Sequence, residues 1–265
     1  MGGSNRGEFM KSSDCTILVT SCMAYQDVLI NFEYFFRKFW RDCPFPIILN
    51  IDDKIETDFP YDQIVVSPHK ENLIRMRDVK IESPYVIMMQ DDHFLFDHVD
   101  TGKILQCIEY ARKYNCGNLR LMQDPIATDT FSDSENLLEY KPGKAYRISA
   151  RGGLWKTDYF KIFVDSFDDL WQMERHGQKL SCQYEEKVLC TKFRVLPIMD
   201  AVHKGCYEDF AAFLLDANAI TPTRAVMSSR QKAIEYIKGA IIDWNPELIT
   251  GIQTKLNLGY KPKYK

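Results

Sequence analysis

Residues 84–95 read PYVIMMQDDHFL, an unbroken apolar run that ends in two adjacent carboxylates. From Tyr85 to Met89 there is no alternation of polar and apolar side chains. A strand of this kind is buried on both faces, which is typical of the centre of a parallel sheet. Asp91 and Asp92 therefore stand where a central strand is expected to end.

Apolar runs elsewhere in the chain predict the rest of the sheet. They lie at residues 16–20, 47–49, 63–66 and 119–121. Between them we expect helices at 27–41, where apolar residues have helical spacing, at the more polar segment 71–80, and at 101–114. Alternating strands and helices predict an α/β fold, a single Rossmann-like domain with a mostly parallel central sheet flanked by helices. Ligands of such sheets bind beyond the carboxyl ends of the strands, so we expect functional residues directly after the apolar runs.

The second half of the chain has shorter and weaker patterns. Residues 124–144 are rich in Asp, Ser, Thr and Pro and are typical of a long loop. Beyond them we expect helices over 157–163 and about 184–190, and an edge strand over 193–198. We expect one domain over residues 10–228, with a donor half at about 10–123 and an acceptor half at about 145–228. A C-terminal helix and a basic tail would follow at 229–265.

The composition is that of a globular enzyme and excludes several other classes. With a net charge of −3, the chain does not have the excess of basic residues that is typical of nucleic-acid binders. No apolar run approaches the roughly 18–20 residues that cross a bilayer, and no secretion signal is present, so we expect a cytoplasmic protein. The eight cysteines form no C-x-x-C pair, which favours reduced thiols without a zinc site. Residues 1–9 are typical of an expression leader before Met10.

The ends of the predicted strands carry candidate nucleotide-binding residues. Adjacent carboxylates at Asp91 and Asp92 are costly to desolvate, and a divalent metal, Mn²⁺ or Mg²⁺, that bridges them to a diphosphate is the simplest partner. Hydroxyls, amides, a further acid and an arginine can bind the remainder of a nucleotide. These candidates are Thr20, Ser21, Cys22, Tyr25, Asp52 and Arg75, with Arg77 as the alternative to Arg75. Solvated turns and exposed helix charges would explain the same residue types.

Further candidates for the donor site and for a second substrate, the acceptor, follow in the later half. Gly153, the second glycine of a pair, allows close approach of the backbone to the donor. Trp155 and Trp171 can contact an acceptor sugar, although a tryptophan can equally fill the core. Glu174 has partly apolar neighbours in sequence, a setting that suits a general base. A helix-terminal ion pair with Arg175 is the alternative.

A late segment, DAVHKG at residues 200–205, adds two candidates. His203 can complete a metal site with Asp92, and Lys204 can meet a diphosphate. A lone histidine is more often structural.

Three of these segments, taken in order, resemble GT-A-fold glycosyltransferases of bacterial capsule, O-antigen and lipooligosaccharide synthesis. The likeness rests on residues 17–22 with the aromatic helix that follows, on 84–95, and on 146–174, and with 203–205 it extends over most of the chain. It implies transfer of a sugar from a nucleotide-diphospho-sugar, often a UDP-sugar, to a hydroxyl of a glycan or lipid-linked acceptor. It also implies Asp92, beside Asp91, as the metal- or donor-binding acid and Glu174 as the base of an inverting enzyme. His93 departs from the common D-x-D motif and leaves metal dependence open.

Two other functions compete with this interpretation. A sugar-nucleotide pyrophosphorylase usually has a glycine-rich basic loop after the first strand, which residues 21–24 (SCMA) do not supply. A non-catalytic nucleotide-binding or scaffold protein of the same fold is the second alternative. The helical stripe at 233–244 and the lysines near the C-terminus could contact the inner membrane peripherally, or form a docked helix and a solvated tail.

Overall fold

The computed structural model describes residues 13–122, 127, 129–143 and 147–234. These residues form two compact units, one ending at Met199 and one beginning at Asp200. This boundary lies inside the segment 10–228. The division of that segment into a donor half and an acceptor half stays a prediction.

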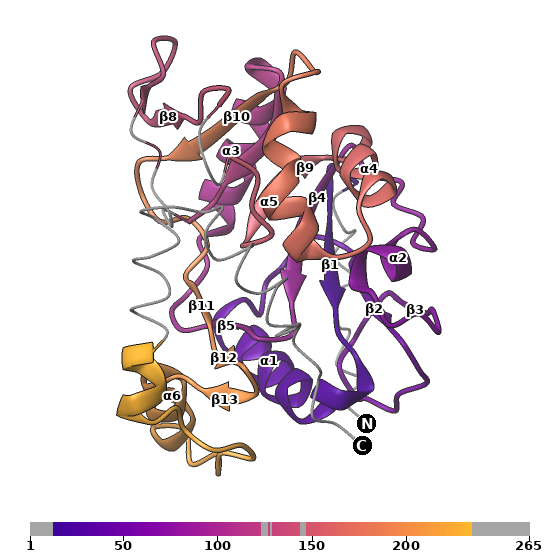
Figure 1. Cartoon of the computed structure of the whole chain (residues 1–265), viewed down its shortest axis with the longest axis vertical. Coiled ribbons are helices and arrows are strands. Elements are labelled where there is room, and N and C mark those ends of the chain that lie inside the picture. The colour runs from indigo at the N-terminus through magenta and orange to yellow at the C-terminus, as the bar shows by residue number, and fades with distance from the viewer. Residues whose placement is uncertain (1–12, 123–126, 128, 144–146, 235–265) are drawn as a thin grey trace, which may run out of the picture. The chain divides into compact units, whose positions relative to one another are not determined.

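The first unit is built on a nine-stranded sheet in the order β3-β2-β1-β4-β9-β6-β10-β8-β7 (Figure 1). Its strands are β1 (Cys15–Thr20), β2 (Ile47–Ile51), β3 (Gln63–Val66), β4 (Tyr85–Gln90), β6 (Cys116–Arg120), β7 (Asp129–Thr130), β8 (Leu137–Glu139), β9 (Gly153–Lys156) and β10 (Lys187–Thr191). Parallel pairs are β1–β2, β1–β4, β2–β3 and β6–β10. β9 is antiparallel to β4 and β6, and β8 is antiparallel to β10 and β7. All strands except β8 and β9 share one direction, which confirms the predicted mostly parallel α/β sheet.

The centre of the sheet is the apolar pair β1 and β4. Their register runs from Cys15 opposite Tyr85 to Thr20 opposite Gln90. Every residue of β1 is buried, and β4 is buried as far as Met89. The absence of alternation in these runs therefore reflects cover on both faces of the sheet.

Helices supply this cover. They are α1 (Gln26–Phe39), α2 (Asn72–Met76), α3 (Thr101–Lys113), α4 (Thr157–Ser166) and α5 (Leu170–Ser181), and a 3₁₀ turn, η1 (Met23–Tyr25), precedes α1. Leu18 and Met88 point to one face and join buried residues of α2, α4 and α5 in a single cluster. The alternate residues Ile17 and Ile87 have no exposed surface either. We therefore place α1 and α3, whose buried residues lie outside that cluster, on the other face.

Three expectations for the second half are wrong. Residues 187–191, expected within a helix at 184–190, form strand β10 between β6 and β8, where Val188, Leu189 and Cys190 are all fully buried. A helix would turn one of these side chains away from the core. The edge strand expected over 193–198 begins only at Ile198, where β11 (Ile198–Asp200) pairs with β5 (His93–Leu95). The long loop expected over 124–144 contains the β7–β8 hairpin.

The second unit is a small hairpin and helix. β12 (Val202–His203) pairs with β13 (Cys206–Tyr207), and α6 (Asp209–Asp216) follows. Residues 229–234 are helical, and the rest of the predicted tail, 235–265, lies outside the described residues. No helix in the described part of the chain has the length and hydropathy required to cross a membrane.

Candidate functional site

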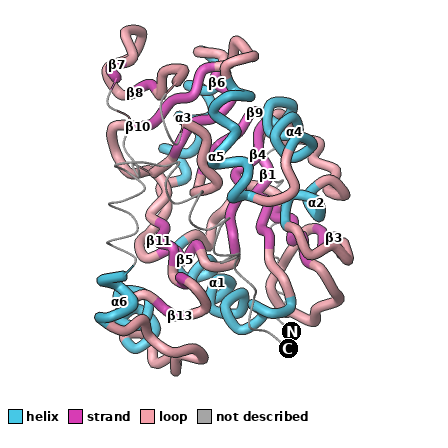
Figure 2. The backbone as a smooth tube through the Cα atoms, in the orientation of Figure 1, coloured by secondary structure: helices cyan, strands magenta, loops and turns pink. Residues whose placement is uncertain are grey.

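The chain order of the strands identifies one edge of the sheet as the candidate site. From β1 the chain continues to β2 and β3 on one side, and it then returns to β4 on the other side of β1 (Figure 2). This reversal is a topological switch point, and in open α/β sheets ligands bind outside the carboxyl ends of the strands at such a point. Thr20 and Gln90, the last residues of β1 and β4, are register partners here.

Ser21 and Asp91 are joined directly across the switch point. The Ser21 hydroxyl donates to Oδ2 of Asp91 over 2.6 Å, and the Asp91 amide donates to the Thr20 carbonyl over 3.1 Å. Both side chains are buried. A hydrogen bond of this length to a carboxylate is a strong, charge-assisted one. The ends of β1 and β4 are therefore fixed to each other by side chain as well as by backbone.

Asp92 is the more accessible acid of the pair, since it is half-buried whereas Asp91 is buried. Its carbonyl accepts the Phe94 amide over 3.0 Å in the turn that leads into β5. His93 is 1% exposed, and its Nδ1 lies 3.2 Å from the Gln90 amide. His93 therefore takes part in the turn itself, and Asp92 is the acid best placed to meet a cation.

The other candidates after β1 and β2 surround the same edge. Oδ1 of Asp52 accepts the amide of Met23 over 2.7 Å, which ties the end of β2 to η1. Cys22 precedes η1 and Tyr25 is its last residue, and both are half-buried. Burial raises the pKa of the Cys22 thiol to about 11, and the carboxylates of Asp91 and Asp52 add to this effect. Thr20 is buried, and its hydroxyl has no hydrogen-bond partner among the residues that the structure describes.

Arg75 has a different environment from the one predicted. Its guanidinium is buried and donates to the carbonyls of His69 (3.0 Å), Lys70 (2.8 Å) and Ser21 (2.9 Å). These bonds connect the segment before α2 to the end of β1. Because both terminal nitrogens bond the backbone, Arg75 shapes the loop that carries Ser21, and its predicted phosphate contact stays a prediction.

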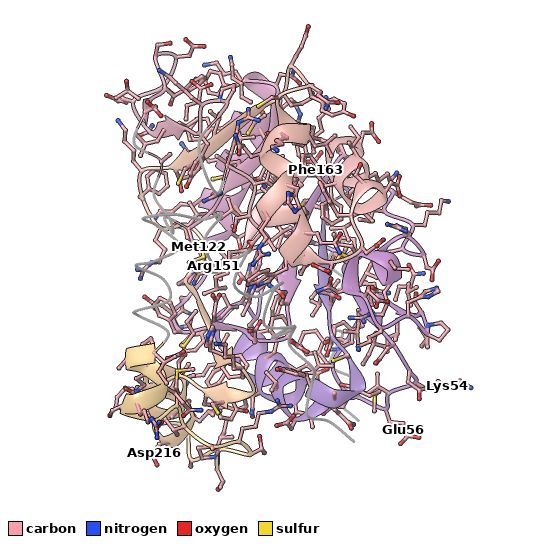
Figure 3. The ribbon with its side chains drawn as sticks, viewed as in Figure 1. Lys54, Glu56, Met122, Arg151, Phe163 and Asp216 are labelled. Carbon is pink, nitrogen blue, oxygen red and sulfur yellow. The ribbon has the colours of Figure 1, made fainter. Side chains whose placement is uncertain are left out.

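The start of β9 brings the later half of the chain to the same edge. Gly153 is opposite Met88 of β4 and Arg120 of β6, so residues 149–152 lie at the carboxyl ends of those strands. The Leu121 amide donates to the Gly152 carbonyl over 3.3 Å, consistent with Arg151 beside Met122 in Figure 3. A Cβ on Gly153 would lie 2.8 Å from Nδ2 of Asn118. Packing against Asn118 thus explains this glycine, and its predicted donor contact stays a prediction.

Glu174 reaches this edge from α5. Its Oε1 accepts hydrogen bonds from the Ser149 hydroxyl (2.9 Å) and the Ala150 amide (2.8 Å). The other oxygen, Oε2, receives no hydrogen bond from the residues that the structure describes. The side chain is half-buried. The predicted base is therefore held firmly through one oxygen and has the second available.

The two tryptophans predicted to contact an acceptor are placed very differently. Trp155 has no exposed surface and packs against Phe160 and Phe163, each with ring centroids 5.5 Å away. The predicted acceptor contact does not fit Trp155, which belongs to the core. Trp171 is 58% exposed and lies three residues before Glu174 on α5. The Arg175 guanidinium lies 3.7 Å from the centroid of its ring.

His203 and Lys204 belong to the second unit, at the turn of the β12–β13 hairpin, and both are exposed. Lys204 has a φ of 51° and Gly205 a φ of 78°, as a tight hairpin turn requires. A metal site shared by Asp92 and His203 stays a prediction. Across the part of the chain that the structure describes, no group of three or more His, Cys, Asp and Glu side chains is placed to hold a metal ion.

Sequence reasoning missed a group of buried polar residues next to Glu174. Arg120 is 1% exposed, and it donates to the Tyr140 hydroxyl over 2.9 Å while its guanidinium lies 4.0 Å from the centroid of that ring. Burial lowers the pKa of Arg120, and the Tyr140 hydroxyl and the Glu174 carboxylate oppose that effect. Arg147, also buried, donates to the Tyr140 carbonyl over 2.8 Å. The sequence signal for this group was the presence of two polar residues, Asn118 and Arg120, inside the strand 116–120.

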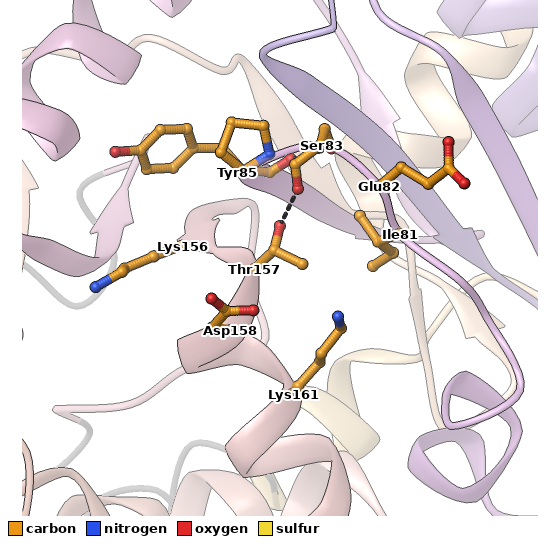
Figure 4. Close-up of a pocket in the computed structure, with 9 residues that line it drawn as sticks. Ile81, Glu82, Ser83, Tyr85, Lys156, Thr157, Asp158 and Lys161 are labelled. Atoms are coloured by element: carbon orange, nitrogen blue, oxygen red, sulfur yellow. Dashed lines mark hydrogen bonds between the residues drawn. The ribbon is translucent and has the colours of Figure 1, made fainter.

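A pocket of about 350 Å³ lies at the opposite edge, where β4 begins and β9 ends (Figure 4). Thr157 donates to the Ser83 carbonyl over 2.7 Å in its wall. Lys156, which also lines the pocket, forms an ion pair with Glu186 at 2.9 Å. The amino ends of parallel strands are not where such sheets bind ligands, and we assign the pocket no role.

No family model matches the sequence, and no curated protein matches it. Solved structures of S. aureus TarS are similar. The fragment 1–349 matches with a TM-score of 0.42 and 8% identity, over 70% of this chain and 59% of that one. The same fragment in complex with UDP-GlcNAc matches with a TM-score of 0.41 and 9% identity, over 70% and 57%. The complex with UDP matches with a TM-score of 0.42 and 9% identity, over 70% and 59%. The matched part is less than two thirds of each TarS chain.

Proposed function

We propose that the chain is a glycosyltransferase that moves a sugar from a nucleotide-diphospho-sugar to a hydroxyl group. The observation that carries this proposal is the convergence of two features on one sheet edge. Ser21 and Asp91 join the ends of β1 and β4 at the topological switch point, and Glu174 is held at residues 149–150 beside the end of β4. A nucleotide site and a candidate base therefore share one edge.

The donor would bind around the ends of β1, β2 and β4. Asp52, Cys22 and Tyr25 lie at or within η1, and the proposal assigns them to the nucleoside. Asp92 fits a divalent cation, because Mg²⁺ is commonly held by one or two carboxylates while substrate phosphates supply other ligands. Such a cation, Mn²⁺ or Mg²⁺, would offset the charge that grows on the leaving diphosphate. UDP is the first nucleotide to test, because the sequence resembles enzymes that often use UDP-sugars.

The acceptor would bind against α5. Trp171 offers an exposed aromatic face to a sugar, and Arg175 already covers part of the ring. Oε2 of Glu174 takes the proton of the acceptor hydroxyl while its oxygen attacks the anomeric carbon from the face opposite the nucleotide. The bond from that carbon to the diphosphate breaks, and its electron pair leaves with the nucleoside diphosphate. This route inverts the configuration of the sugar. The diphosphate contact of Lys204 and the metal ligand His203, which the sequence suggests, stay predictions.

Glu174→Gln tests the role of the base, with the exposed Glu185→Gln as the matched control. Glu174→Gln should lower turnover by about 10²- to 10⁴-fold, the usual contribution of a positioned base, and leave nucleotide affinity unchanged. Unchanged turnover would remove Glu174 from this role. Proton NMR of the new linkage should show inversion, and retention would contradict the mechanism.

A lipid-linked or glycan acceptor of bacterial surface polysaccharides is the acceptor class we propose. α6 exposes Phe210 (50%) and Phe213 (64%), whose stacked rings are suited to a lipid interface. The intact chain should therefore sediment with anionic liposomes, and a Phe210→Ser/Phe213→Ser variant should sediment less. An intact chain that stays in the supernatant would contradict the membrane contact.

A further inference from the structure

The loop before β9 does more than reach the sheet edge, because it holds one side chain of α5 in a single orientation. The Ser149 hydroxyl donates to Oε1 of Glu174 over 2.9 Å and accepts the Arg151 amide over 3.2 Å. The second bond leaves the hydroxyl hydrogen directed at Glu174. The Ala150 amide donates to the same Oε1 over 2.8 Å. Two donors therefore converge on one carboxylate oxygen.

Both partners in this contact are themselves fixed. The loop is tied to β6 by the Leu121 amide and continues directly into β9 at Gly153. α5 lies very close to the loop, because a Cβ on Gly177 would come within 3.1 Å of Cγ2 of Ile148. A larger residue there would push α5 away from Ser149. The distance between Ser149 and Glu174 is thus set by packing on both sides.

We propose that Ser149 is a positioning residue for the base Glu174. By occupying Oε1, Ser149 and the Ala150 amide hold the carboxylate in one rotamer and leave Oε2 for the acceptor hydroxyl. A carboxylate without these bonds would rotate and present Oε2 correctly for only part of the time. Misplacement of a reacting group by about 1 Å can lower turnover by about 10²-fold. This inference rests on the proposed function.

A double-mutant cycle tests this role, with Ser149→Ala, Glu174→Gln and the double variant compared in a radiolabelled transfer assay. Ser149→Ala should lower kcat by about 10- to 100-fold, with nucleotide affinity and donor KM unchanged. In the Glu174→Gln background it should change kcat less than about twofold, because the group that it positions no longer accepts a proton. Ser149→Thr keeps the hydroxyl and should restore most of the activity. Ser166→Ala removes a hydroxyl that donates to the Ile162 carbonyl of its own helix, and it serves as control.

Several outcomes would overturn this inference. Equal losses from Ser149→Ala in both backgrounds, or a parallel loss of nucleotide affinity, would show a general structural role. If Ser149→Ala kept full activity while Glu174→Gln was inactive, the positioning role of Ser149 would be ruled out. The proposed function would still stand. An inactive wild type would overturn the proposed function and this inference with it.

Discussion

The Ser21 hydroxyl lies 2.6 Å from Oδ2 of Asp91, although the two residues are 70 positions apart in the chain. Parallel pairing of β1 and β4 in the register Thr20 to Gln90 is what brings them together. The bond is buried, so water does not compete for either group. It holds Asp91 in place and leaves its neighbour Asp92 as the accessible acid. The geometry of the proposed donor site therefore depends on a contact between a hydroxyl and a carboxylate.

Ser21→Ala should damage both stability and nucleotide binding. Loss of a buried hydrogen bond to a charged group should lower the free energy of unfolding by about 2 kcal/mol, measured by urea denaturation. Nucleotide affinity, measured by calorimetry, should fall because the turn at Asp91 and Asp92 is no longer anchored. Ser132→Ala is the matched control, since Ser132 makes a 2.8 Å bond to Asp133 on the surface. If both variants behaved alike, the bond to Asp91 would not be what holds the site.

Arg75→Lys should weaken the binding of UDP and UMP by the same factor. Arg75 bonds three carbonyls, and a lysine has no planar fork with which to replace them, so the loop that carries Ser21 should loosen. Calorimetry with both nucleotides measures this ratio. A phosphate contact by Arg75 would instead weaken UDP much more than UMP, and that result would contradict the role assigned here.

Substitution of Trp155 should affect the stability of the protein, whereas substitution of Trp171 should affect acceptor binding. Trp155→Ala should destabilise the protein by about 3–5 kcal/mol, because it removes a fully buried ring from the core. Trp171→Ala should change the free energy of unfolding by less than about 0.5 kcal/mol, as expected for an exposed residue. It should raise the acceptor KM and leave the donor KM unchanged. An unaltered acceptor KM would remove Trp171 from the acceptor site.

The first half of the fold was predictable because its sequence patterns follow from burial. β1, β2, β3 and β4 are short apolar runs. The central strands β1 and β4 are buried on both faces, so their sequences show no alternation of polar and apolar residues and are recognisable as buried strands. α1 was predictable from its regularly spaced aromatic residues, several of which are buried. The position of Asp91 and Ser21 at one edge also follows from parallel strands alone.

The second half was less predictable for physical reasons. β9 has only four residues, and the glycines before and within it resemble a turn, so it was not recognised as a strand between β4 and β6. β10 is a short apolar run, and periodicity cannot distinguish such a run from a buried helix. The contact from Ser149 to Glu174 depends on how α5 packs on the loop before β9. Nothing in a single sequence encodes such a contact locally, and the opposite environments of Trp155 and Trp171 are equally invisible in it.

Cys22 should react slowly with iodoacetamide at pH 8. Burial and the two carboxylates raise the pKa of its thiol to about 11, so the thiol stays protonated at this pH, and only the thiolate is nucleophilic. Its alkylation, followed by peptide mass spectrometry, should be much slower than that of the exposed Cys182. The rate should rise about tenfold per pH unit between pH 8 and 10 as the thiolate fraction grows. Asp52→Asn should accelerate it and a bound nucleotide should slow it. Equal rates for Cys22 and Cys182 at pH 8 would contradict the placement of Cys22 between the carboxylates.

The central claim is that the carboxyl ends of β1 and β4 bind a nucleoside diphosphate through Asp92. Isothermal titration of UDP, GDP, CDP and CMP, each with and without Mn²⁺, tests it on the wild type, on Asp92→Ala and on Asp53→Ala, an exposed acid after β2. We predict that one nucleotide binds, UDP first among them, that Asp92→Ala weakens it at least about tenfold, and that Asp53→Ala does not. If none of the four bound to the wild type with or without Mn²⁺, the claim and the glycosyltransferase proposal built on it would be contradicted.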